Sequence, residues 1–499
     1  MTEEISRRRV LKGLSIGGLS IGAGAVGLGA CASGTANQAQ SAVPAGSAPS
    51  SGSSSSISPV KPVIPATTGT MKAPVLLGIP TTQTPQEAGA RPDPTRPEGT
   101  DLLPEIEHIV VLMMENHSFD NYFGMLGRGD GFPLGADGTP VATNLDDTGK
   151  AVAAFHAPTT SQKGVRVSQN WASTHKQYDD GKMDGFATAS SPGAMGYFTG
   201  DDIPFYYGLA KAFPICDRYF ASVMAQTYPN RRFLQAATAR GNITTDLPKV
   251  TEPPPPNGTI FDALTTHGVT WKNYTHGLPE LALYPSVYMA NQDKIAKMDR
   301  FVADAAAGTL PQYSVVTPHP NISEENPQDI TEGEAFSCAV INAVMSGPKW
   351  AKTLLVFTYD EHGGYYDHVA PPPAFAPDDV GPDQTKTKGV PGTYDRLGMR
   401  VPTVIVSPYA RKDYVSSVVH DHTSVLRLVE TKWNLGALTR RDANASNLLD
   451  TIDLDSPPAF LTPPKLPSSK KPPDAQPIPP PLDAEGKPAS LSMLRVELA

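Results

Sequence analysis

Residues 106–116 read IEHIVVLMMEN, a nearly continuous apolar run that ends in a carboxylate and an amide. Residues 353–361 read TLLVFTYDE and end in two carboxylates. Such runs are typical of strands buried on both faces of a parallel sheet. Because ligands of open α/β sheets bind beyond the carboxyl ends of strands, we expect the polar ends of both runs to meet at one edge.

The four residues at these ends are predicted to bind a divalent cation: Glu115, Asn116, Asp360 and Glu361. Three carboxylates in a small volume repel one another and raise each other's pKa unless a cation neutralises them. Oxygen ligands favour a hard cation such as Mg²⁺, Ca²⁺ or Mn²⁺, while zinc or iron joined by a histidine stays an alternative. One such pair alone would more often be a solvated turn or a helix cap, but two pairs in matching contexts favour the metal site.

Further elements of the same kind lie between and after these runs. Residues 401–407 predict another central strand, and residues 229–240 and 423–433 predict helices. The alternation indicates an α/β fold, a three-layer α/β/α sandwich around a mostly parallel sheet.

Composition divides the 499 residues into four parts. Residues 101–455 are predicted to form the catalytic domain, because only they carry enough apolar pattern for a core. Residues 32–100 are rich in Ser, Pro and Ala and predict a flexible tether. Residues 456–499 are Pro-rich and disfavour regular structure. Residues 1–31 form the remaining part.

The first 31 residues resemble an export signal. Residues 6–12 read SRRRVLK and precede a Gly/Ala-rich stretch, as in twin-arginine signals. Residues 28–31 resemble a bacterial lipobox, in which Cys31 becomes the lipidated first residue; an ordinary cleavage site is the alternative. The stretch is too short and glycine-rich for a membrane span. We therefore expect a protein of the periplasm, cell surface or outer membrane, tethered to the membrane surface by lipid.

Charge and cysteine content exclude other classes. The formal net charge is −9 and no basic stripe is present, so nucleic acid is not an expected partner. The chain has 3 cysteines, too few for a disulfide framework, although Cys216 and Cys338 could pair after export.

Residues 115–124 read ENHSFDNYFG, which resembles the opening motif of the bacterial phospholipase C and acid phosphatase family of phosphoesterases, relatives of alkaline phosphatases. Further segments are similar to later motifs of that family in the same order: residues 216–219, 227–232, 359–369 and 421–424. The resemblance implies an alkaline-phosphatase-like fold, hydrolysis of phosphoric esters and the metal ligands named above.

The resemblance also implies that Thr227 is the nucleophile. Pro229 suits the first turn of a helix, which would place Thr227 at a helix N-terminus where free N–H groups favour an anion. The alternative is that Thr227 only caps this helix. Arg231 is expected to clamp a phosphate oxygen through its planar fork, and the alternative is that Arg231 and Arg232 are surface charges.

Four histidines lie in positions similar to family motifs. His175 and His276 are expected to protonate the leaving group, and His368 and His422 to contact substrate or orient ligands. Where the family commonly has Glu-His-Pro, this chain has Asn326, whose amide cannot donate a proton at neutral pH. The general acid therefore stays open.

The residues named above are compatible with three functions. The first is cleavage of a phospholipid in the manner of phospholipase C through a phosphothreonine intermediate. The second is a broad acid phosphatase acting on small phosphate esters, which His276 and His362 favour. The third is a non-catalytic surface protein that uses the metal fold for binding.

Overall fold

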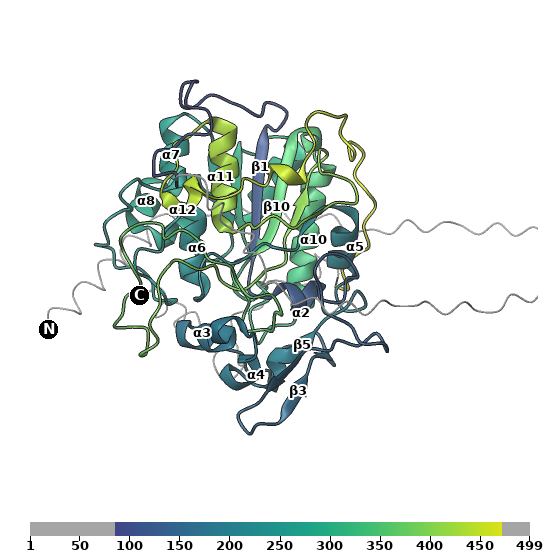
Figure 1. Ribbon diagram of the computed structural model, residues 1–499. Coiled ribbons are helices and arrows are strands. Elements are labelled where there is room, and N and C mark those ends of the chain that lie inside the picture. The colour runs from purple at the N-terminus through teal and green to yellow at the C-terminus, as the bar shows by residue number, and fades with distance from the viewer. Residues whose placement is uncertain (1–84, 472–499) are drawn as a thin grey trace, which may run out of the picture.

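The computed structural model describes residues 85–471. Within this range an eight-stranded sheet forms the centre, in the order β12-β6-β11-β10-β1-β9-β7-β8 (Figure 1). Its strands are β1 (His108–Met114), β6 (Ile215–Cys216), β7 (Trp271–Thr275), β8 (Ile295–Ala296), β9 (Tyr313–Thr317), β10 (Thr353–Tyr359), β11 (Val404–Val406) and β12 (Val415–Ser416).

The two apolar runs form neighbouring central strands, as predicted. β1 pairs in parallel with both β10 and β9, and every residue of β1 and β10 is buried. The sheet is mostly parallel, which confirms the expected fold class. β11 is the exception among the central strands, since it runs antiparallel to β10 and β6. It is also shorter than the predicted 401–407, because Pro402 lacks the N–H that a ladder needs.

Helices cover both faces of the sheet and complete the three layers (Figure 1). One face carries α6 (Thr227–Ala236), α7 (Ile260–Thr266), α8 (Pro285–Ala290), α11 (His422–Trp433) and α12 (Arg440–Ala443). The other carries α5 (Pro204–Ala212), α9 (Met298–Ala307) and α10 (Ile330–Ser346). α6 begins earlier and ends earlier than the predicted 229–240, because Ala237 adopts a left-handed conformation.

A smaller layer lies beyond the edge at which β1 and β10 end (Figure 1). It consists of α2 (Phe119–Phe123), β2 (Thr143–Leu145), β3 (Ala151–Ala153), β4 (Phe155–His156), α3 (Trp171–Tyr178), α4 (Phe186–Ala189) and β5 (Gly196–Tyr197). A second apolar cluster fills it, built around Phe132, Phe186, Tyr197 and Tyr366. This layer therefore stands over the edge that carries the predicted ligands.

The packed unit extends past both predicted limits of the 101–455 domain. Asp93 donates its backbone N–H to the Asn434 side chain, and Phe460 packs against Phe213 with ring centroids 4.8 Å apart. Residues 85–100 and 456–471 thus belong to the domain surface, since loops without regular structure can still bond to a core. Cys31, the signal and residues 32–84 and 472–499 lie outside the described residues.

The possible pairing of two cysteines can be compared with the structure. Cys216 on β6 and Cys338 on α10 are both buried and no disulfide joins them, so the predicted pairing is wrong. The Cys338 sulfur instead accepts a hydrogen bond from Asn342, one turn along the same helix, at 3.2 Å. Among residues 85–471, no helix has the length and apolar character needed to cross a membrane.

Candidate active site

The ends of parallel strands bring the predicted ligands together. Tyr359, the last residue of β10, is paired with Met114, the last residue of β1. Asp360 and Glu361 therefore emerge beside Asn116, and all three are buried. The two pairs of ligands lie at one edge of the sheet, as the sequence predicts.

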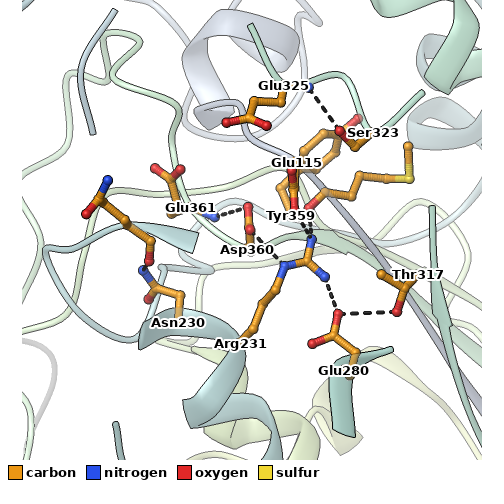
Figure 2. A network of polar contacts seen from close by, with 12 residues as sticks. Glu115, Asn230, Arg231, Glu280, Thr317, Ser323, Glu325, Tyr359, Asp360 and Glu361 are labelled. Atoms are coloured by element: carbon orange, nitrogen blue, oxygen red, sulfur yellow. Dashed lines mark hydrogen bonds and ion pairs between the residues drawn. The ribbon is translucent and has the colours of Figure 1, made fainter. Parts of the chain in front are cut away.

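Arg231 on α6 reaches into this group and binds its carboxylates. Its Nε lies 3.0 Å from Oδ2 of Asp360, and its Nη2 lies 3.2 Å from Oε1 of Glu115. A third ion pair joins Nη1 to Glu280, which is on the turn of residues 280–283 after β7. The fork of Arg231 was expected to clamp phosphate, but here carboxylates occupy all of its nitrogens (Figure 2).

The site nevertheless keeps more negative charge than one guanidinium can neutralise. Burial raises the pKa of Glu361 well above its ordinary value, and the charge of Glu115 adds to this rise. Burial and the charges of Glu115, Asp360 and Glu361 raise the pKa of Glu325 to about 8. Figure 2 shows the side chains of Glu325 and Glu361 beside Asp360. The excess charge calls for a further cation or for protons.

The donor set fits a divalent cation. Oε1 of Glu361 is buried and has no hydrogen-bond partner within residues 85–471, and the same holds for Nδ2 of Asn116. A buried carboxylate oxygen without a partner is costly unless an ion completes it. Carboxylate and amide oxygens are ligands that hard divalent cations prefer.

Thr227 is the first residue of α6 and is buried. Gln226 precedes it as the N-cap residue and no side chain caps the helix, so the alternative that Thr227 serves as the cap is wrong. Thr227 and Arg231 are one turn apart and share a face of the helix. Because Arg231 binds Asp360 and Glu115, Thr227 lies next to the ligand group, at the end where N–H groups favour an anion.

The loop that leads to Thr227 is fixed by the side chain of Asn230. Its Oδ1 accepts from the backbone N–H of Val223 at 3.0 Å, while its Nδ2 donates to the carbonyls of Val223, Ala225 and Gln226. One amide thus holds four backbone groups of the loop. Thr227 is therefore positioned by a rigid segment.

The two predicted general acids have different surroundings. His175 on α3 donates from Nδ1 to the carbonyl of Trp171 at 2.8 Å, and burial lowers its pKa. It lines a pocket of about 350 Å³ that Met224, from the loop before α6, also lines. His276 follows β7 directly and is exposed. Since β7, β9, β1 and β10 are parallel neighbours, His276 leaves the sheet at the ligand edge, about 10 Å from β1 by strand spacing.

His422 lies inside the site but faces the backbone. Its Nε2 donates to the carbonyl of Asp360 at 2.6 Å, and burial lowers its pKa to about 4. Its ring is fully buried, so of the two expected roles the contact fits orientation of the candidate ligand Asp360 and not contact with substrate.

His368 belongs to a second polar group. Its ligand atom and those of Asp120 and Asp367 lie within 4.8 Å of one another and could hold a metal ion. Arg400, however, already pairs with Asp120 at 3.0 Å and with Asp367 at 2.9 Å, with both carboxylates fully buried. Burial alone would lower the pKa of His368, but its hydrogen bonds to Asp120 and Asp130 raise it to about 10. Since Arg400 already neutralises both carboxylates of this group, whereas the buried Oε1 of Glu361 lacks a hydrogen-bond partner among the described residues, the group that contains Glu361 is the better metal site.

Sequence reasoning did not assign Glu280 or Glu325 to the site. Both follow parallel strands, β7 and β9 respectively, but with loops of several residues between strand and carboxylate. Thr317, at the end of β9, donates to Glu280 at 3.3 Å. Glu115 was predicted because it follows the carboxyl end of a buried strand. The same criterion, applied to the whole loop after each parallel strand, would have identified Glu280 and Glu325 as candidates.

The sequence pattern of the Phosphoesterase family matches residues 106–436 and so includes all of these groups. The chain belongs to this family. It is accordingly a hydrolase that acts on phosphoric ester bonds, as the resemblance implied.

Two curated relatives and one solved structure are similar to parts of the chain. Non-hemolytic phospholipase C from Pseudomonas aeruginosa is 31% identical over 379 residues, which cover 67% of this chain and 54% of that protein. Non-specific phospholipase C1 from Arabidopsis thaliana is 32% identical over 412 residues, covering 73% of this chain and 74% of the relative. A protein in the alkaline phosphatase superfamily from Vibrio parahaemolyticus has a TM-score of 0.35 and 8% identity, with 72% of this chain and 75% of that chain covered.

Proposed function

We propose that the chain is an exported, metal-dependent phospholipase C that releases diacylglycerol and a phosphorylated head group from phospholipids. The observation that carries this proposal is the position of Thr227, one helical turn from Arg231, which binds Asp360 and Glu115. A hydroxyl at a helix N-terminus beside a carboxylate cluster suits phosphoryl transfer. Relatives named phospholipase C support the substrate class.

The residues that would hold the cation are Glu115, Asn116, Asp360 and Glu361. When bound, the cation would supply a lower pKa for the attacking hydroxyl and charge neutralisation for the phosphate oxygens. His422 keeps the Asp360 carbonyl in place through its hydrogen bond of 2.6 Å. The buried wall of β1 and β10 excludes water behind the ligands.

Thr227 Oγ1 attacks phosphorus in line with the ester oxygen of diacylglycerol. The bond from phosphorus to that oxygen breaks, and the imidazole of His175 or His276 takes the proton of Thr227 and passes it to the departing oxygen. The phosphothreonine then carries the phosphorylated head group, with its oxygens against the first N–H groups of α6. Water attacks phosphorus and the bond to Oγ1 breaks. One proton of the water passes through the same imidazole to Thr227, and the other stays on the phosphorylated head group.

A substitution of the nucleophile tests this proposal. Thr227→Ala should lower kcat on phosphatidylcholine by at least about a thousandfold, as loss of a nucleophile does. Metal content by elemental analysis and the unfolding temperature should stay unchanged. Thr227→Ser keeps the hydroxyl and should retain measurable turnover. A near-normal rate for Thr227→Ala would overturn the mechanism.

A broad acid phosphatase is the second candidate, and exposed His276 at the ligand edge favours it. His362, which the sequence also linked to that activity, is fully buried and its Nε2 is bonded to Gln177 at 2.7 Å, so it does not face a substrate. Parallel assays on phosphatidylcholine and p-nitrophenyl phosphate separate the two candidates. Protein without metal and without either activity would favour a binding protein.

We also propose export by the twin-arginine route with lipidation of Cys31. The support is the sequence of residues 1–31. Cys31→Ser should move the protein from the membrane fraction to the soluble fraction of exported protein. Replacement of Arg7 and Arg8 by lysine should leave it in the cytoplasm.

A further inference from the structure

Large apolar side chains gather on the outside of the small layer. Leu134, Val141, Leu145 and Phe155 are 52%, 59%, 54% and 38% exposed. The described residues contain ten large apolar side chains with such exposure, and four of them fall in this short segment. Single exposed apolar residues are ordinary, whereas a group confined to one hairpin region indicates an interaction surface.

One face of the β2–β3 hairpin is exposed to solvent. Thr143 pairs with Ala153 and Leu145 pairs with Ala151, and all four side chains are exposed. The alternate pair faces inward, where Val152 packs on the second apolar cluster. A two-stranded hairpin packed on one side normally presents polar residues on the other. Here the strands' outer face carries no charged side chain.

The hairpin is tied to the layer that stands over the active site. The Oδ1 of Asn144 on β2 accepts the backbone N–H of Phe186 on α4 at 2.8 Å. On neighbouring α3, Gln177 bonds to His362, the residue after Glu361, at 2.7 Å. Figure 1 shows β3, α3 and α4 together beyond the edge at which β1 and β10 end. The bare face and the ligand group therefore lie at the same end of the molecule.

We propose that this docking face, defined as Leu134, Val141, Leu145, Ala151 and Phe155, binds the surface of a zwitterionic phospholipid bilayer. The inference rests on the proposed phospholipase function, because a lipid substrate must approach the end of the molecule that carries the ligands. Insertion of Leu and Phe side chains into the boundary between head groups and acyl chains removes their apolar surface from water.

Charge on the same segment selects the kind of bilayer. Residues 134–153 contain Asp137, Asp146, Asp147 and Lys150 as their only charged side chains, a net charge of −2 from three acids and one base. Basic residues are what attract proteins to anionic lipid, and this segment has an excess of acids. A bilayer of phosphatidylcholine is therefore the matching surface, and phosphatidylglycerol should bind less well.

Aspartate substitutions on the docking face test the proposal. Full-length Leu145→Asp and Val141→Asp should each bind sedimenting phosphatidylcholine vesicles at least about tenfold more weakly than the parent, since each change removes one buried side chain and adds a charge. Met289→Asp and Leu461→Asp are matched controls, because these residues are 54% and 56% exposed elsewhere on the molecule. Turnover of soluble p-nitrophenyl phosphorylcholine and the unfolding temperature should not change in any variant.

The outcomes separate docking from catalysis. Parent protein that binds vesicles but hydrolyses neither substrate would contradict the proposed function and leave the docking face supported. The docking proposal would be overturned if the hairpin variants bind vesicles and cleave vesicle lipid like the parent. It would also be overturned if both control variants lose as much vesicle binding as the hairpin variants do. A dimer seen by light scattering that Leu145→Asp dissociates would assign the face to a second copy of the chain instead.

Discussion

Arg231 and Asp360 form a buried ion pair, with Nε of the guanidinium 3.0 Å from Oδ2 of the carboxylate. The same guanidinium also pairs with Glu115 and Glu280, so one side chain from α6 offsets charge from three loops. It holds the ends of β1 and β10 against the helix that begins with Thr227. The arrangement supplies a fixed counter-ion at the centre of the proposed metal site.

Removal of this counter-ion should destabilise the protein. Arg231→Met leaves three carboxylates unpaired, and the free energy of unfolding should fall by about 3–5 kcal/mol. Urea denaturation with a chelator present measures it. Arg232→Met is the control on the same helix, since the one carboxylate that pairs with Arg232 in the described part of the chain is Glu252, which is partly exposed. Equal losses in the free energy of unfolding for the two variants would show that the three ion pairs of Arg231 contribute no more to stability than the single ion pair of Arg232.

Metal affinity should distinguish the two polar groups that could bind a cation. Glu361→Gln removes a carboxylate whose Oε1 has no other partner, and Mn²⁺ affinity by calorimetry should fall at least about tenfold. His368→Gln alters the other group and should leave Mn²⁺ affinity unchanged. If His368→Gln weakens binding and Glu361→Gln does not, the metal belongs to the group of Asp120 and Asp367.

His368 should make stability depend on pH. Burial opposes its charge, but the hydrogen bonds to Asp120 and Asp130 raise its pKa to about 10, above the unfolded value of about 6.5. The stabilisation is complete below pH 6.5 and is lost as pH rises to 10, because only the folded state keeps the proton. The free energy of unfolding should fall by up to about 1.4 kcal/mol per pH unit in this window. The His368→Gln variant should lose this slope; an unchanged slope would assign it to other groups.

Gly363, two residues after Glu361, should not tolerate a side chain. Its φ is +65° and an added Cβ would lie 2.0 Å from the backbone oxygen of Asn116. Gly363→Ala should lower the free energy of unfolding by more than about 2 kcal/mol and displace the Asn116 ligand. Gly149→Ala, with φ of +81° and open space, should cost only about 1 kcal/mol. Comparable urea midpoints for the two variants would contradict the close approach.

The sequence was sufficient to locate the central strands and the polar residues at their ends. β1 and β10 are buried on both faces, so their apolar runs are continuous, and the carboxylates follow within two residues. The resemblance to the phosphoesterase family singled out Thr227, and Pro229 agrees with its place at the start of α6 because proline suits the first turn of a helix. These predictions depend on patterns within short stretches of sequence, which are visible in one sequence.

The remaining features depend on contacts between distant segments. Glu280 and Arg231 meet across the fold, and nothing in their flanking residues indicates it. The orientation of β11 and the inward direction of His422 are likewise set by packing. The ranges 85–100 and 456–471 carry few apolar residues, but the Asn434 side chain donates to the carbonyl of Asp93 in the first range, and Glu334 accepts the backbone N–H of Lys470 in the second. Composition alone does not indicate such contacts.

The ion pairs of Arg231 affect the order in which the protein folds and binds metal. Because the guanidinium already offsets carboxylate charge at the sheet edge, the chain can reach its compact state before any ion arrives. Under the proposed function, binding of the cation would then be separable from folding and could take place later, in a different compartment. The supply of metal, and not the completion of folding, would decide when the proposed enzyme becomes active.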